Sequence, residues 1–345
     1  MKSDSKLHYT ILYSDCETSI RVIDDYKNRD DCDLVEIGWR GDKNPITYAL
    51  RRLHTSFRLN QIIPLPFRHI WYNFLYRKIK NPENEIVITY ATLFYKYDVD
   101  VFLKAWKKRG IKTYIIFLDS MKSEIYIGQH ICPHILKYIP PENIFSFDKS
   151  DCEEYGFNYL NESYYSNSNL EIIKEEPKIE YDAYILARTK PGRTEIINNL
   201  YEMFKKHDVK AKIDFVAIPK LDKDFYANRN LNSEIKVLTD YVKYEDVIKS
   251  SAKSNCIIEI GQGGVNAPTL RYFEAVTHNR KLLTNIKYTK NLNFYNEKYM
   301  KITDFKEENI DFDWIKKREK VNYGYKGEFS PSNILKMIEK LEKSK

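Results

Sequence analysis

The sequence predicts an α/β protein made of two doubly wound domains. Its 345 residues exceed the size of one ordinary domain, and 43% of them are hydrophobic, which allows each half a sizeable core. Strand-like runs alternate with helix-like runs, which is typical of parallel sheets covered by helices. This alternation stops once, at a polar stretch over 161–181, and then starts again. We therefore expect one domain at 1–165, a linker at 166–181 and a second domain at 182–325.

The first domain is expected to begin with a strand, because residues 7–15 form a β-rich run that ends in a polar loop. Similar runs predict further strands at 33–39, 84–91, 111–119 and 142–148. Residues 96–110 have an apolar face and stop at Gly110, which is typical of a helix. Pro64 and Pro66 divide the basic and aromatic stretch at 51–80 into two helical pieces.

The second domain repeats the alternation. Strands are predicted at 182–188, 211–219, 255–261, 280–286 and 298–305, and helices at 194–208, 244–254 and 267–279. At 326–345 we expect a separate amphipathic helix, with Ser330 as its N-cap and Pro331 in its first turn.

The cysteines and histidines exclude several kinds of site. Five cysteines are widely scattered and form no C-x-x-C pair, so we expect neither a disulfide framework nor a zinc site, and a reducing cytoplasm is the simplest setting. Neither a signal-peptide core nor an apolar run of membrane-spanning length is present in the sequence. "HICPH" at 130–134 has nothing nearby to complete a metal site, and "DVD" at 98–100 begins a predicted helix. We expect no metal and no cofactor.

The net charge of +7 is concentrated in residues 51–80, which contain seven Lys and Arg and no Asp or Glu. The 49 basic residues outside this stretch are balanced by 49 acidic ones. Cations interleaved with aromatic residues are typical of a membrane interface. We therefore expect an anionic inner membrane surface as the partner, bound by Arg58, Arg68, Trp71, Arg77 and Lys78. The alternatives are a core helix with a solvated basic face and a nucleic-acid surface. No nucleic-acid-binding motif accompanies the charge, so we expect no nucleic acid.

The stretch "GQGGVNAPTLRYFEA" at 261–275 follows a predicted strand and opens a predicted helix. Ligands bind at that edge of a doubly wound sheet, and a glycine-rich turn with a helix N-terminus suits an anion. Gly263 and Gly264 would present backbone N–H groups, Arg271 lies in the first turn, and Glu274 could accept hydrogen bonds from ribose hydroxyls. The alternative is an ordinary tight turn, with Arg271 and Glu274 as a surface pair.

A second stretch, "ARTKPGR" at 187–193, follows the first strand of the same domain. Its Arg188, Lys190 and Arg193 fall in one strand-to-helix loop, which opens toward the same edge of the sheet. Three cations beside a helix N-terminus suit a diphosphate. The alternative is a solvated basic loop.

Residues 244–295 resemble the nucleotide-binding half of bacterial glycosyltransferases of the GT-B type, found in gene clusters for capsular polysaccharide and lipopolysaccharide (O-antigen). The resemblance rests on the strand ending in Glu259, the glutamine–glycine turn, Thr269-Leu270-Arg271, Phe273-Glu274-Ala275, Leu282-Leu283-Thr284-Asn285 and Phe294-Tyr295. It implies two Rossmann-like domains facing a cleft, with a nucleotide-sugar donor in the second and the acceptor in the first. Glu274 would hold the ribose, Arg188, Lys190 and Arg193 the diphosphate, and Thr269 and Arg271 the phosphates or the sugar. "VNAPT" lacks the glycine expected before the threonine.

The implied reaction is metal-independent transfer of a sugar to a hydroxyl of a lipid-linked surface oligosaccharide, by an enzyme peripherally bound to the inner membrane face. An inverting enzyme needs a general base, and Asp15, Glu17 and Asp119 lie at predicted strand ends of the first domain. Each of these is also compatible with a helix cap or a solvated position. Two alternatives remain: a polyol-phosphate transferase of the same fold, and a non-catalytic docking partner of a glycosyltransferase.

Overall fold

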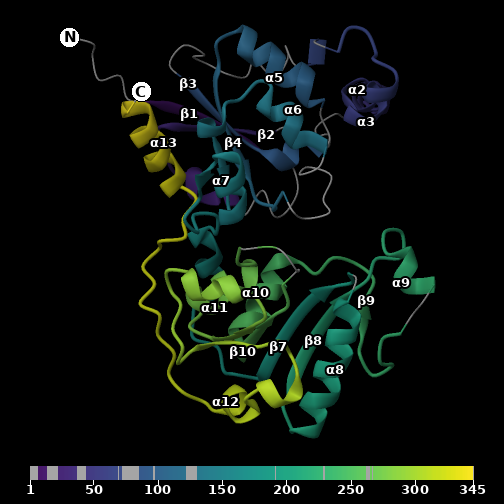
Figure 1. The fold of residues 1–345 in the computed structure, drawn as a ribbon, viewed down its shortest axis with the longest axis vertical. Coiled ribbons are helices and arrows are strands. Elements are labelled where there is room, and N and C mark those ends of the chain that lie inside the picture. Colours follow the sequence, from purple (N-terminus) through teal and green to yellow (C-terminus); the bar gives the residue numbers. More distant parts are fainter. Residues whose placement is uncertain are drawn as a thin grey trace. The chain divides into compact units, whose positions relative to one another are not determined.

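A computed structural model of the chain forms two compact units (Figure 1). It describes residues 7–13, 22–36, 44–68, 70–71, 85–95, 98–121, 130–190, 192–227, 230–261, 265 and 267–344. Unit 1 comprises Met1–Ser166 and Glu328–Lys345, and unit 2 comprises Asn167–Gly327. Each unit is built around one parallel six-stranded sheet.

The sheet of unit 1 has the strand order β2-β1-β3-β4-β5-β6, and all its neighbouring strands pair in parallel. The strands are β1 (His8–Tyr13), β2 (Cys32–Glu36), β3 (Glu85–Tyr90), β4 (Lys112–Phe117), β5 (Ile144–Ser146) and β6 (Asn158–Tyr159). The helices are α2 (Pro45–Thr55), α3 (Phe57–Ile62), α5 (Val99–Lys108), α6 (Cys132–Leu136), α7 (Lys149–Tyr155) and α13 (Asn333–Lys343).

Helices cover both faces of this sheet. On one face, Leu12, Val87 and Ile115 pack with Phe102 and Trp106 of α5 in one buried cluster. Asp98 caps α5 by accepting a hydrogen bond from the amide of Val101, so "DVD" begins a helix as expected. On the other face, Tyr9 and Tyr114 donate hydrogen bonds to Glu339 and Glu342 of α13.

The sheet of unit 2 has the strand order β12-β11-β10-β7-β8-β9, again with parallel pairing throughout. The strands are β7 (Tyr181–Arg188), β8 (Ala211–Val216), β9 (Val237–Leu238), β10 (Ser254–Glu259), β11 (Lys281–Thr284) and β12 (Met300–Ile302). Numbered within the unit, this order is 3-2-1-4-5-6, the strand order of the Rossmann fold. The first strand, β7, therefore lies at the centre beside the fourth, β10.

Helices cover the unit 2 sheet as well. They are α8 (Arg193–Lys206), α9 (Lys223–Ala227), α10 (Tyr244–Ala252), α11 (Leu270–Thr277) and α12 (Phe312–Lys316). Ile185 and Ile258 pack with Leu200 of α8 and Ile315 of α12 in one cluster. Helices α10 and α11 pack on β10, and the side chains that alternate with this cluster, such as Ile257, are also fully buried.

The predicted fold class of two Rossmann-like α/β domains is confirmed. The structure divides the chain differently at two places from the boundaries drawn on the sequence. Most of the polar stretch at 166–181 belongs to unit 2, where it includes a 3-10 turn at Asn167–Ile172. The C-terminal helix belongs to unit 1, because Ile334, Leu335 and Ile338 are buried there. Among the described residues, no helix combines the length and apolarity needed to cross a membrane.

Candidate functional site

The strand order of unit 2 places a crevice at the carboxyl ends of β7 and β10. Connections from β7 run to one side of the sheet through β8 and β9, and those from β10 run to the other side through β11 and β12. The loops that leave the two central strands therefore diverge. In open α/β sheets, ligands bind at such a switch point.

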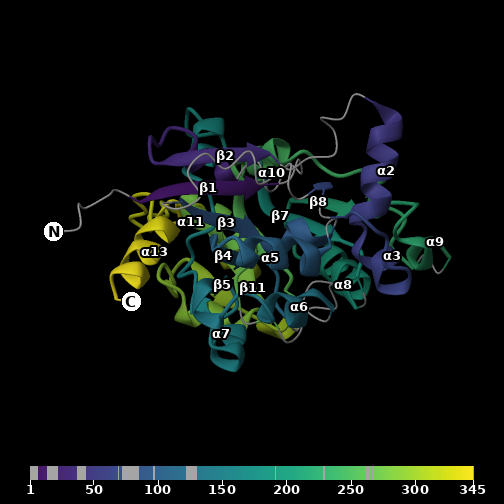
Figure 2. The same cartoon turned by 90° about the horizontal axis from the view of Figure 1, so that it is seen from above.

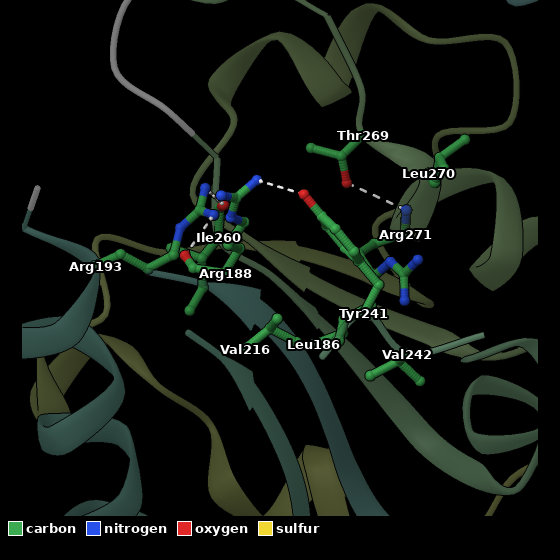
Figure 3. Close-up of a pocket in the computed structure, with 10 residues that line it drawn as sticks. All are labelled: Leu186, Arg188, Arg193, Val216, Tyr241, Val242, Ile260, Thr269, Leu270 and Arg271. Atoms are coloured by element: carbon green, nitrogen blue, oxygen red, sulfur yellow. Dashed lines mark hydrogen bonds between the residues drawn. The ribbon is translucent and has the colours of Figure 1, made fainter. Parts of the chain in front are cut away.

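A pocket with a volume of about 330 Å³ lies at this switch point (Figure 3). It is lined by the ends of β7 and β8, the segment before α10, and the residues that enter α8 and α11. The lining residues are Leu186, Arg188, Arg193, Val216, Tyr241, Val242, Ile260, Thr269, Leu270 and Arg271. The lining of the pocket is therefore mostly apolar, apart from three arginine side chains.

Arg188 is the last residue of β7, and it is held in place from two sides. Its guanidinium donates to Asp222 Oδ1 at 3.3 Å and to the Tyr241 hydroxyl at 3.4 Å, and it lies 5.6 Å from the centre of the Tyr241 ring. Its side chain is still 38% exposed. Asp222 and Tyr241 accept hydrogen bonds from only some of the N–H groups of Arg188. Arg188 can therefore offer its other N–H groups to an anion in the pocket.

Arg193, the first residue of α8, joins the two central strand ends. Its guanidinium donates to the carbonyl oxygens of Arg188, at 3.2 Å, and of Ile260, at 3.0 Å. Burial lowers the pKa of this side chain. Two backbone carbonyls therefore fix Arg193, and it shapes the pocket in addition to contributing positive charge.

Thr269 caps α11 and is tied to the end of β10. Its hydroxyl accepts a hydrogen bond from the amide of Arg271 at 3.1 Å, and its own amide donates to Glu259 Oε1 at 2.8 Å. The other oxygen of Glu259 accepts from the Thr284 hydroxyl of β11 at 2.6 Å. Glu259 is fully buried, and this burial raises its pKa. The start of α11, with its positive dipole end, is thereby fixed beside the pocket.

Arg271 and Glu274 form a buried ion pair within α11. The side chain of Arg271 is 9% exposed and that of Glu274 is 0% exposed. Glu274 also accepts hydrogen bonds from the hydroxyls of Tyr244, at 3.1 Å, and Ser251, at 2.6 Å. Burial raises the pKa of Glu274, against the opposing influence of the Arg271 cation. Arg271 reaches the pocket, whereas the Glu274 carboxylate lies behind it.

The structure gathers four of the expected donor-binding residues around one pocket: Arg188, Arg193, Thr269 and Arg271. Lys190 is partly buried but does not line the pocket, and neither does Glu274. The expected ribose contact of Glu274 stays a prediction. Gly263 and Gly264 lie outside the described residues.

Three features of the site were missed by the sequence analysis. Tyr241 and Asp222, which hold Arg188, come from loops far from it in the sequence. Gly261 donates its amide to Asn285 Oδ1 at 2.7 Å, and a Cβ atom at this position would lie 2.4 Å from Ile286 Cγ1. A strand-end glycine followed by glycine-rich sequence could have indicated the close approach of Gly261. No spacing rule links Arg188 to Tyr241 or Asp222.

In unit 1, the expected catalytic residues are placed only in part. Asp119 lies two residues beyond the carboxyl end of β4 and is partly buried. Its neighbours Ser120 and Met121 both donate hydrogen bonds to the buried Asp151, which fixes this strand end. Asp15 and Glu17 lie outside the described residues.

Helices α2 and α3 carry Arg51, Arg52 and Arg58 of the basic stretch, and they lie away from the strands of the unit 1 sheet (Figure 2). Arg58 is exposed, and Trp71 packs edge-on against His54 with 6.3 Å between ring centres. Arg68 forms an ion pair with Asp98, which is 2% exposed, so its charge is used inside unit 1. Arg77 and Lys78 lie outside the described residues.

This surface is also unusually apolar. Asn44 caps α2, and Ile46, Leu50 and Leu53 then lie on one face of the helix, with exposed fractions of 69%, 49% and 49%. Ile62, Ile63, Phe67 and Ile70 are more than half exposed. Phe67 also has a positive φ of 59°, a costly conformation for a bulky residue. We name the exposed residues of 46–70 the α2–α3 surface.

Comparisons with solved structures agree with this architecture. A complex of S. aureus MnaA with UDP superimposes with a TM-score of 0.52 at 10% identity, covering 96% of this chain and 96% of that chain. A putative UDP-N-acetylglucosamine 2-epimerase from Listeria monocytogenes gives 0.51 at 10% identity, covering 99% and 98%. No family model and no curated protein sequence matches the chain. At these identities the likeness shows the fold: two Rossmann-like domains of the GT-B type.

Proposed function

We propose that unit 2 binds a nucleoside-diphosphate sugar and that the protein transfers the sugar to a hydroxyl of a lipid-linked surface polysaccharide acceptor. One observation carries the proposal. Arg188, Arg193 and Arg271 line one pocket, beside the start of α11, at the switch point of a Rossmann-type sheet. Cations and a helix N-terminus at this place suit a diphosphate better than a neutral ligand.

Each residue has a distinct proposed role. Arg188 is the exposed cation and contacts the diphosphate, with Lys190, Gly263 and Gly264 as further contacts. Arg271 and Thr269 face the phosphates or the sugar from α11. Arg193 holds the two strand ends together through their carbonyl groups. Glu274 neutralises and positions Arg271, and a direct ribose contact would require its carboxylate to leave Tyr244 or Ser251.

These groups could supply the electrostatics of the transfer step. When the bond between the sugar and the diphosphate breaks, negative charge develops on the leaving group. Fixed guanidinium groups and a helix N-terminus stabilise such charge because they are already oriented toward it. The proposed reaction is accordingly metal-independent.

Unit 1 would supply the acceptor side. Asp119 and Asp15 are the proposed candidates for the general base that takes the proton from the attacking hydroxyl. The α2–α3 surface would bind the anionic inner face of the membrane, where a lipid-linked acceptor is anchored. Exposed apolar side chains beside Arg52 and Arg58 suit that interface.

A panel of nucleotides tests the function. UDP compounds come first, because the two structures compared above are a UDP complex and a putative UDP-N-acetylglucosamine 2-epimerase. A bound nucleoside diphosphate or nucleotide sugar should raise the melting temperature, since a ligand at 100 times its Kd adds about 2.7 kcal/mol. No shift with any nucleotide would contradict the proposal and favour a non-catalytic docking partner.

The released nucleotide then identifies the reaction. Sugar transfer releases a nucleoside diphosphate, whereas transfer of a polyol phosphate releases a nucleoside monophosphate. Incubation of each stabilising donor with a membrane-lipid extract, followed by chromatography of the nucleotides, separates the two. Release of a nucleoside monophosphate alone would contradict sugar transfer and would support transfer of a polyol phosphate.

A further inference from the structure

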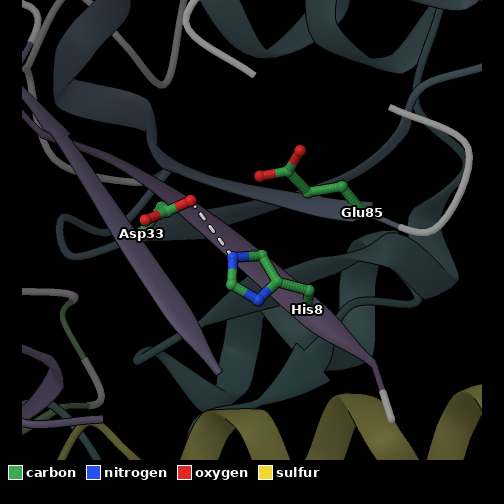
Figure 4. Close-up of side chains that lie close together, drawn as sticks. All are labelled: His8, Asp33 and Glu85. Carbon is green, nitrogen blue, oxygen red and sulfur yellow. Dashed lines mark hydrogen bonds and ion pairs between the residues drawn. The ribbon is translucent and has the colours of Figure 1, made fainter. Parts of the chain in front are cut away.

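Three side chains with metal-binding atoms meet at the amino-terminal edge of the unit 1 sheet (Figure 4). His8, Asp33 and Glu85 come from the adjacent strands β1, β2 and β3. His8 pairs in register with Glu85, and Thr10 pairs with Asp33. Residues two apart on a strand share a face, so all four side chains lie on one face of the sheet.

The geometry fits one metal ion. One ligand atom from each of His8, Asp33 and Glu85 lies within 4.8 Å of the other two. His8 Nε2 lies 3.2 Å from Asp33 Oδ2. Two ligands at zinc–nitrogen and zinc–oxygen distances on a tetrahedral ion are separated by about 3.3 Å. The pair therefore needs little movement to share an ion.

The electrostatics also favour a cation. Glu85 is 3% exposed, and the side chain of Asp33 is 26% exposed. Two carboxylates held this close repel each other, and a bound cation would relieve that repulsion. A divalent ion would balance both carboxylates and would bind the neutral imidazole.

A fourth group provides independent support. Thr10 is fully buried, and its hydroxyl oxygen has no hydrogen-bond partner among the described residues. Such an isolated buried hydroxyl is rare because it costs free energy. Thr10 on β1 pairs in register with Asp33 on β2, so its side chain lies on the same face of the sheet as the cluster. It is thus placed to donate to a ligating carboxylate or to a water on the ion.

We propose that His8, Asp33 and Glu85 form a binding site for a divalent transition-metal ion, with Zn²⁺ as the best match to one nitrogen and two oxygen ligands. The ion would link β1, β2 and β3 at the edge of the sheet opposite to the strand ends where substrates bind. Its role is therefore structural and separate from sugar transfer. Sequence spacing could not indicate it, because the three ligands come from three strands.

The test uses the full-length, tag-free protein stripped of metal with a chelator. Titration with Zn²⁺ should show one tight site per chain by mass spectrometry of bound metal, with a rise in melting temperature. His8→Gln and Asp33→Asn should each weaken Zn²⁺ affinity more than about tenfold. The substitutions are made at His8 and Asp33 because these residues are partly exposed, whereas Glu85→Gln would change a buried residue.

A matched control is His134→Gln. His134 forms a similar pair with Asp100 at 2.5 Å, but Lys137 lies beside it in place of a second carboxylate. Its loss should leave Zn²⁺ binding unchanged. If the parent retains no Zn²⁺, or if His8→Gln binds it as tightly as the parent, the cluster is an ordinary ion pair and the proposal is wrong.

Discussion

Glu274 balances the charge of Arg271 at the wall of the pocket, because the two side chains form a buried ion pair. Breaking a buried ion pair by neutralising one partner leaves the other charge buried without compensation, which typically costs about 3–5 kcal/mol. The hydroxyls of Tyr244 and Ser251 hold the carboxylate in the position where it does this. The ion pair therefore couples the stability of unit 2 to the shape of the pocket.

Glu274→Gln keeps the shape of the side chain and removes its charge. We expect this variant to lower the free energy of unfolding by about 3–5 kcal/mol, measured by urea denaturation. The matched control is Glu245→Gln, which removes an exposed pair with Lys249 on α10 and should cost less than about 0.5 kcal/mol. Equal losses in the two variants would contradict a structural role for the buried pair.

His278 makes the stability of unit 2 depend on pH. Burial, with the nearby Arg280 cation as a lesser cause, lowers the pKa of His278 from 6.5 to about 4. Between these values the unfolded chain binds more protons than the folded chain, so stability falls as the pH falls. The neutral His278 side chain contributes its full stability well above pH 6.5. Between pH 7.5 and 5.5 the free energy of unfolding falls by about 1.3 kcal/mol through this group.

His278→Gln removes this titration. Urea denaturation at pH 7.5 and 5.5 should show that the variant loses about 1.3 kcal/mol less than the parent over this interval. The comparison cancels the other titrating groups, which both proteins share. The same pH dependence in the two proteins would mean that His278 titrates normally.

At the scale of elements, α2 combines a good helix start with an outer apolar face that the described residues of unit 1 leave exposed. Asn44 and Pro45 begin the helix, and Ile46, Leu50 and Leu53 then present an exposed apolar stripe beside Arg52. A helix that folds on a globular core normally turns such a stripe inward. The proposed contact with a membrane would account for its outward orientation.

Leu50→Ser combined with Leu53→Ser tests this contact with the membrane. The parent should bind vesicles that contain anionic phosphatidylglycerol more tightly than vesicles of neutral phosphatidylcholine. The double variant should bind the anionic vesicles at least about tenfold more weakly, since each leucine contributes on the order of 1 kcal/mol. Sedimentation with vesicles measures both.

The control for this experiment is Leu221→Ser, which removes an exposed leucine in unit 2. It should leave vesicle binding unchanged. Parent protein that does not sediment with anionic vesicles, or a double variant that binds like the parent, would exclude the α2–α3 surface as a membrane contact.

At the scale of the whole molecule, the sequence was sufficient for the central strands of the two sheets, because each is a buried apolar run between helices. It did not indicate the short edge strands β6 and β9, which have two residues each. It also indicated that Arg188, Arg193, Thr269 and Arg271 lie near one edge of the sheet, because they fall in the segments that join strands β7 and β10 to the helices after them, and the structure brings them to one pocket. Their part in binding a donor stays a prediction. The sequence did not indicate that Tyr241 and Asp222 contact Arg188. Nor did it indicate the cluster of His8, Asp33 and Glu85. Only the tertiary structure brings these residues together. The sequence also did not show that Arg68 is engaged by Asp98 or that Glu274 is enclosed by α10.

The central claim is that the pocket between the ends of β7 and β10 binds a nucleoside diphosphate. Calorimetric titration of the best nucleotide into the parent, Arg188→Gln and Arg318→Gln tests it most directly. Arg318 is an exposed arginine of unit 2 that is paired with Asp182 and does not line the pocket. We predict that Arg188→Gln weakens binding at least about tenfold, because a charge-assisted contact contributes about 1.5–3 kcal/mol, and that Arg318→Gln binds like the parent. Equal affinities in all three proteins would contradict the assignment of this pocket.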